Sequence, residues 1–120
     1  MAGASLLLTA AALLGALAVG LGALGGHALQ QHLQADQLAT WDTATRYLMW
    51  HVLAALAIAL AARTPLLGAG WILLTGAVLF SFSLYGWLLL AFRPLVFVTP
   101  LGGVVMIAGW LWLAWKTIAH

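Results

Sequence analysis

The amino-acid sequence predicts an all-α membrane protein, an antiparallel bundle of four transmembrane helices with a short interfacial helix after the first span. Hydrophobic residues make up 66% of the 120 residues and charged residues only 5%, whereas soluble domains carry about 25% charged residues. Four apolar stretches each reach the ~20 residues that a helix needs to cross the hydrocarbon core. Prolines and charged residues separate the later stretches.

The four spans are expected in one transmembrane domain that covers residues 1–120, at residues 5–26, 43–62, 67–91 and 100–118. The first apolar stretch exceeds the ~7–15 residues of a signal-peptide core, so we expect it to be retained as a helix. Arg63-Thr64-Pro65 separates the second span from the third, and Arg93-Pro94 separates the third from the fourth.

The connections carry the signals for helix ends. Residues 27–42 form the longest polar stretch, and their pattern predicts the short interfacial helix. Asp36 or Thr40 is expected to cap the second helix. Thr99-Pro100 predicts an N-cap followed by proline at the first helical position, with residues 95–98 extended before it.

Four spans place both termini and the Arg63 loop on one side of the membrane and the other two loops opposite. The tryptophans predict two interfacial belts, formed by Trp71, Trp110, Trp112 and Trp115 on the side of the termini, and by Trp41, Trp50 and Trp87 on the other. The first span is rich in glycine and alanine, which let helices approach closely in lipid. Packing within the bundle and a homo-oligomer contact both explain this composition.

Composition excludes several classes of function. The absence of cysteine excludes disulfides and cysteine-ligated metals, and four basic residues are too few for a nucleic-acid-binding patch. Ser81 and Ser83 lack a Gly-x-Ser-x-Gly context. His27 and His51 make a poor zinc site, and haem ligation by either has no supporting attachment motif. We therefore expect no enzyme activity, no catalytic residue, no metal and no cofactor.

Polar side chains within the spans are the candidate site, because each is costly in lipid and needs a partner or a purpose. Helix direction alternates, so these residues fall in one half of the membrane: His27, Arg46, Tyr47, His51, Ser81, Ser83, Tyr85 and Thr99. Structural hydrogen bonding between helices and a ligand, ion or proton site both explain the cluster.

Two contacts within this cluster are specific predictions. Asp42 and Arg46 are four residues apart, which favours an ion pair. His51 is expected to face the interior and bond a polar group of another helix, because an unpaired polar group in hydrocarbon costs several kcal/mol. The expected partners are Ser81, Ser83, Tyr85 or the backbone near Gly25.

Several short motifs together resemble a known family. They are Gly25-Gly26-His27-Ala28-Leu29, Thr43-Ala44-Thr45-Arg46-Tyr47 with His51, Phe80-Ser81-Phe82-Ser83-Leu84-Tyr85, and Thr99-Pro100-Leu101-Gly102-Gly103 with Gly109-Trp110. Their order resembles the YgdD/YwdK family of small membrane proteins of unknown function, related to transmembrane protein 256. The resemblance implies a four-helix fold in the bacterial inner membrane, and it supplies no catalytic residues. Phe82 departs from the glycine usual in the family, which puts a bulky ring between two serines.

Function is expected to be that of a multi-pass membrane protein with a non-enzymatic structural or accessory role. The alternative is a small transporter, channel or anionic-lipid binder that uses the polar cluster, with Arg46 on a lipid phosphate. Expected partners are membrane lipid and a homo-oligomer or larger membrane complex, without nucleic acid. Small multidrug exporters depend on an intramembrane glutamate, and this chain has no glutamate. The signature of small fluoride channels is not matched by Gly25-Gly26 and Arg46 at this spacing.

Overall fold

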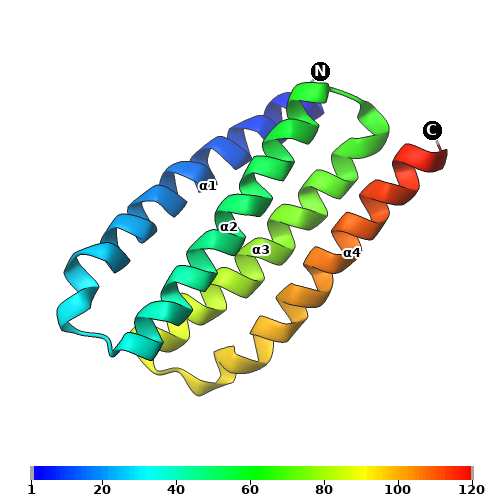
Figure 1. Ribbon diagram of the computed structural model, residues 1–120. Helices are drawn as coiled ribbons and strands as arrows, with labels where there is room; N and C mark the ends of the chain where they lie inside the picture. Colours follow the sequence, from blue (N-terminus) through cyan, green and yellow to red (C-terminus); the bar gives the residue numbers. More distant parts are fainter. Residues whose placement is uncertain (1, 120) are drawn as a thin grey trace.

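The computed structural model describes residues 2–119, and this part of the chain is helical almost throughout, without a β-strand. Its elements are α1 (Ala2–Gly26), the 3₁₀ helix η1 (Ala28–Gln31), α2 (Ala35–Ala61), α3 (Thr64–Leu90), the 3₁₀ helix η2 (Arg93–Phe97) and α4 (Val98–Ala119). Successive long helices run antiparallel. The start of α1 and the end of α4 lie with the α2–α3 connection at one end of the molecule (Figure 1). The predicted fold class is confirmed.

Within residues 2–119, four helices are long and apolar enough to cross a membrane. α2 and α3 contain 27 residues each, which corresponds to about 40 Å, whereas the hydrocarbon core is about 30 Å thick. Each therefore extends beyond the hydrocarbon by a turn or more, where polar residues can meet water.

The second helix begins earlier than the predicted span. α2 starts at Ala35, and the side chain of Gln37 accepts a hydrogen bond from the backbone N–H of Gln34 at 2.8 Å. Capping by Asp36 or Thr40 was therefore a wrong prediction, since Asp36 lies in the first turn. The apolar pattern marks where a helix enters lipid, and the helix itself starts in the polar segment before it. The predicted interfacial helix is only the short η1.

The fourth helix also differs at its start. Residues 93–97 form the 3₁₀ helix η2, which runs directly into α4 at Val98. The extended entry over residues 95–98 and the N-cap at Thr99 were wrong predictions. Pro94 and Pro100 each fall in a first turn, where the missing N–H of proline costs no intrahelical bond.

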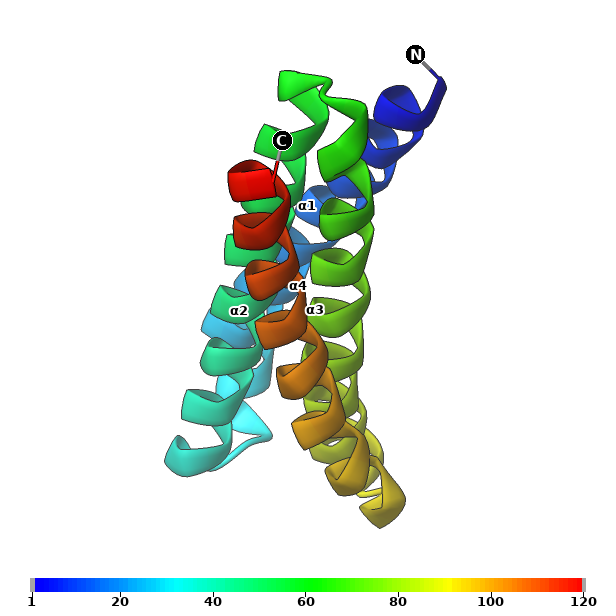
Figure 2. The same ribbon diagram turned by 90° about the vertical axis from the view of Figure 1, so that its right-hand side faces the viewer.

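The four helices form a flattened assembly with overall extents of 49 × 25 × 18 Å. α2 packs against α1 on one side and α3 on the other. α4 packs against α3 and makes little contact with α1 or α2, and it crosses α3 obliquely (Figure 2). This arrangement leaves space between α2 and α4 over the surface of α3.

Glycines hold α3 and α4 in backbone contact. A Cβ atom added at Gly76 would lie 2.6 Å from the backbone nitrogen of Met106 and 3.0 Å from the carbonyl oxygen of Gly102. A Cβ atom at Gly102 would lie 2.8 Å from the Cα of Phe80. These separations are shorter than van der Waals contact, so only glycine allows this approach. We call this contact the glycine seam.

The small residues of α1 lie on two faces of the helix. Ala11 and Ala18 are buried in the core, whereas Ala12, Ala16 and Gly20 are exposed on the outer face. A Cβ atom added at Gly20 would meet nothing within 4 Å. Part of the small-residue pattern is therefore explained by packing in the bundle, and part of it faces outward.

Replacement of Gly102 by alanine should separate α3 from α4, because the added methyl group meets backbone atoms that cannot move aside. We expect a loss of about 1–3 kcal/mol in the free energy of unfolding, measured by denaturant titration in detergent. Gly103→Ala is the matched control, since a Cβ atom there meets nothing within 4 Å. A Gly102→Ala protein as stable as Gly103→Ala would contradict the seam.

Candidate functional site

Two side chains of α3 hold α2 by hydrogen bonds deep in the bundle. The hydroxyl group of Ser81 donates to the carbonyl oxygen of Ala44 at 2.7 Å, and the hydroxyl groups of Tyr85 and Thr45 are 2.6 Å apart. Ser81 and Tyr85 are both buried. These predicted site residues therefore join helices.

Two further predicted residues join α3 to α4. The hydroxyl oxygens of Ser83 and Thr99 are 2.6 Å apart, and the Ser83 hydroxyl also lies 2.8 Å from the carbonyl oxygen of Phe80. One hydrogen bond thus connects the helices and another returns to the helix backbone. Both polar groups are satisfied without a ligand.

Trp41 fastens α1 to α2, a role that the sequence analysis missed. Its indole N–H donates to the carbonyl oxygen of Leu21 at 2.8 Å, and its ring centroid lies 4.4 Å from that of Tyr85. Its side chain is 1% exposed, so it packs inside the bundle and does not face lipid. Gly25 makes room for it, because a Cβ atom there would lie 2.6 Å from the indole nitrogen. The glycines before the first loop were the available signal.

His51 is buried between α2 and α4, with both ring nitrogens engaged. The Nδ1 atom lies 2.6 Å from the carbonyl oxygen of Tyr47, and the indole N–H of Trp110 donates to Nε2 at 3.0 Å. An indole N–H can only donate, so Nε2 must accept and the ring proton is assigned to Nδ1. The imidazole is therefore neutral in this arrangement, and neither nitrogen is free to bind a ligand.

The prediction that His51 faces the interior and bonds another helix is confirmed, but the predicted partners were wrong. Its partner is Trp110 of α4, whereas the serines and Tyr85 bond elsewhere. Trp110 had been assigned to an interfacial belt. It lies nearly midway along α4, at the same depth as the middle of α2.

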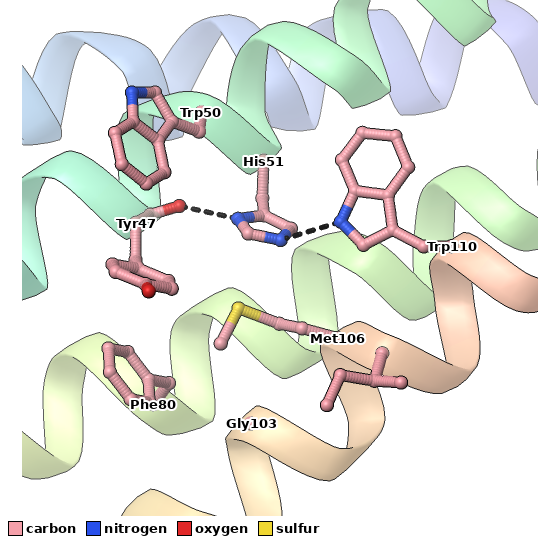
Figure 3. A pocket seen from close by; sticks show the side chains of 8 residues that line it. Tyr47, Trp50, His51, Phe80, Gly103, Met106 and Trp110 are labelled. Carbon is pink, nitrogen blue, oxygen red and sulfur yellow. Dashed lines mark hydrogen bonds between the residues drawn. The ribbon is translucent and has the colours of Figure 1, made fainter.

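A groove opens beside this pair, with a volume of about 500 Å³. Its lining comes from α2, α3 and α4 and consists of Tyr47, Trp50, His51, Phe80, Gly103, Met106, Ile107 and Trp110. In Figure 3, Tyr47 and Phe80 lie on one side of the groove and the His51–Trp110 pair on the other, with Met106 between them. The rings of Tyr47 and Phe80 are 4.9 Å apart.

The remaining predicted residues lie outside the groove. Arg46 forms the predicted ion pair, with its Nε atom 2.8 Å from an Asp42 carboxylate oxygen, and both side chains are exposed. His27 is exposed at the start of η1. The eight predicted residues are thus divided among interhelical bonds, the groove and the surface, and they do not form one site.

A second pocket lies at the end of the molecule where α3 meets η2. It has a volume of about 260 Å³ and is lined by Trp87, Arg93, Val96 and Phe97. Among residues 2–119, Arg93 has no carboxylate within ion-pair distance. The sequence analysis had treated it only as a helix breaker.

Metal binding has no donor set in the part of the chain that the structure describes. No group of three or more histidine, aspartate or glutamate side chains is close enough there to share an ion. The groove has an apolar, largely aromatic lining with one neutral histidine, and such a lining favours uncharged molecules.

These features define a multi-pass helical membrane protein whose intramembrane polar groups mostly join its own helices. The chain belongs to the family described as "Protein of unknown function (DUF423)", which matches residues 21–103. This membership confirms the resemblance found in the sequence motifs.

Curated relatives cover most of the chain and are named as membrane proteins. This chain is 44% identical to the UPF0382 membrane protein SSP2132 of Staphylococcus saprophyticus, over 81% of its own length and 83% of the relative. It is 46% identical to the UPF0382 membrane protein C1782.12c of Schizosaccharomyces pombe, over 83% and 91% respectively. For the UPF0382 membrane protein YwdK of Bacillus subtilis the identity is 38%, over 87% and 89%. No solved structure matches the chain.

The His51–Trp110 bond should contribute measurably to stability. His51→Leu and Trp110→Phe should each lower the free energy of unfolding by about 0.6–2 kcal/mol, the range for one interhelical hydrogen bond. The double variant should lose less than the sum of the two, because both changes remove the same bond. Denaturant titration in detergent measures all three. Trp115→Phe is the control, since Trp115 is 60% exposed on α4, and strictly additive losses would contradict the bond.

Proposed function

We propose that the protein is a non-enzymatic accessory subunit that contributes a stable four-helix unit to a larger membrane assembly. The supporting observation is that its buried polar groups are bonded within the bundle. No buried side-chain nitrogen or oxygen in the described residues lacks a hydrogen-bond partner. Five of the candidate residues bond a neighbouring helix: His51, Ser81, Ser83, Tyr85 and Thr99. A transport path or reaction centre requires polar groups that are free to exchange partners.

The outer face of α1 is the favoured contact surface for this role. Ala12, Ala16 and Gly20 are four residues apart and face outward. Small side chains at this spacing allow another transmembrane helix to approach closely. The second helix belongs either to a second copy or to a different membrane protein.

Ala16→Leu should break this assembly, because the larger side chain holds the second helix away. Native mass spectrometry of the protein released from membranes in mild detergent should show the native chain in a complex of fixed stoichiometry. The Ala16→Leu variant should be released alone. Ala108→Leu provides the same substitution on an exposed position of α4 and should retain the complex.

Two results would contradict this proposal. A native chain that is monomeric in mild detergent and in nanodiscs, with no partner after crosslinking in intact membranes, would contradict an accessory role. Loss of the complex in both leucine variants would contradict the choice of the α1 face.

A second candidate function is binding of an anionic lipid, and Arg93 is its specific support. The guanidinium group is suited to a phosphate, and Trp87 and Phe97 provide apolar surface beside it. Arg46, the residue first considered for this function, is neutralised by Asp42. Arg93 is therefore the better placed of the two.

Arg93→Gln should reduce the amount of anionic phospholipid that remains bound after purification, whereas Arg46→Gln should retain it. Native mass spectrometry of protein equilibrated with mixed phosphatidylglycerol and phosphatidylcholine measures this difference. We expect the loss to be specific to phosphatidylglycerol, because glutamine removes the charge and keeps much of the side-chain stem. Equal retention of phosphatidylglycerol by the two variants would exclude this site.

A further inference from the structure

The groove between α2 and α4 lies near the middle of the bundle. His51 is sixteen residues after the start of α2 and ten before its end, and Trp110 is twelve residues after the start of α4. At about 1.5 Å per residue, both positions are more than 10 Å from either end of their helices. Charged headgroups lie at the membrane surface, so a molecule that enters the groove at this depth is neutral and dissolved in lipid.

The size of the groove favours a small molecule. Its volume of about 500 Å³ lies within the ~300–1,000 Å³ of ligand pockets. A transmembrane helix is about 10 Å across. The hydrogen bond between His51 and Trp110 joins α2 directly to α4 at 3.0 Å. A helix could therefore enter the groove only by breaking this bond and separating α2 from α4.

The lining favours a flat ring over a lipid tail. On one side of the groove the ring of Tyr47 packs on two others, with centroids 5.1 Å from Trp50 and 4.9 Å from Phe80. The indole ring of Trp110 lines the other side (Figure 3). Aromatic faces pack well on another flat ring at such distances. Met106 lies between the two sides (Figure 3), and a methionine side chain adjusts readily to the shape of a ligand.

One polar group in the lining is free to recognise a ligand. The hydroxyl group of Tyr47 forms no hydrogen bond with any residue in the range 2–119, while its carbonyl oxygen is engaged with His51. His51 and Trp110 satisfy each other. The groove thus presents a hydroxyl donor beside aromatic faces, which suits a ring that carries an acceptor oxygen.

We propose that this groove binds a neutral, lipid-soluble molecule with a planar ring and a carbonyl oxygen, the chemistry of a quinone. The ring lies among Tyr47, Phe80 and Trp110, and the Tyr47 hydroxyl donates to the carbonyl oxygen. The proposal concerns binding alone and includes no electron transfer. It goes beyond the accessory role and is independent of it, since the groove and the outer face of α1 are separate surfaces.

Gly103 allows a test that leaves helix packing intact. Gly103 lines the groove, and a Cβ atom there would meet nothing within 4 Å. Gly103→Leu should therefore fill the groove without straining the seam. Gly26→Leu is the matched control, because Gly26 has the same open surroundings on α1 and lies outside the groove. Far-UV circular dichroism and gel filtration establish that both variants are folded.

The experiment titrates decylubiquinone into protein held in phosphatidylcholine nanodiscs and follows the quenching of tryptophan fluorescence. We expect saturable quenching in the native protein and in Gly26→Leu, and at least a tenfold weaker apparent affinity in Gly103→Leu. Tyr47→Phe removes only the donor and should weaken binding about threefold to tenfold, as expected for one hydrogen bond. Decanol, which has a tail but no ring, should not compete.

Three results would each overturn the proposal. Equal quenching in the native protein and in a folded Gly103→Leu variant would mean that the quinone only partitions into the lipid. Competition by decanol would assign the groove to lipid tails. Undiminished affinity in Tyr47→Phe would show that the Tyr47 hydroxyl does not bond the carbonyl oxygen of the quinone. The Tyr47→Phe variant still tests the proposal if Gly103→Leu does not fold.

Discussion

Lipid offers no hydrogen-bond partner, and this constraint determines how the helices of this protein are joined. A polar group in hydrocarbon is costly unless another part of the protein satisfies it. The chain meets this requirement between neighbouring helices: Trp41 reaches the backbone of α1, Ser81 and Tyr85 reach α2, and Ser83 and His51 each meet a side chain of α4. Each bond also fixes the rotation of one helix against the next. The polar residues that looked like a site in the sequence thus serve largely to align the bundle.

The glycine seam determines where the remaining space lies. Because Gly76 and Gly102 bring the backbones of α3 and α4 together, α4 is committed to α3 and stays apart from α2 along much of its length. The resulting groove is lined by aromatic rings, and the hydrogen bond between His51 and Trp110 connects α2 to α4 beside it. Its properties therefore follow from glycines that contribute no functional group. Phe82, which departs from the family pattern, does not disturb the seam, and its ring packs edge-on against Tyr85 at 5.5 Å.

The sequence predicted the number, direction and membrane character of the helices, because these depend on apolar length and on breakers such as Arg63-Thr64-Pro65. It also predicted the pair formed by Asp42 and Arg46, which depends only on spacing within one helix. Contacts between helices were harder to predict from the sequence. The partner of His51 could not be chosen from the sequence, because it depends on the oblique crossing of α4. The N-cap of α2 was placed two or six residues too late, because a helix that leaves the membrane keeps its hydrogen bonds but loses its apolar pattern.

The weak attachment of α4 to α2 has a kinetic consequence. A hydrogen bond worth about 1 kcal/mol is broken in roughly 15% of molecules at any instant. Within residues 2–119, α2 and α4 are joined by one such bond, which Trp110 donates to His51. When it breaks, α4 can pivot on the seam while Ser83 and Thr99 keep its first turn in place. Such rigid-body motions of helices take microseconds to milliseconds. Molecules dissolved in the bilayer would then exchange sideways through the lipid-facing wall, without crossing either membrane surface.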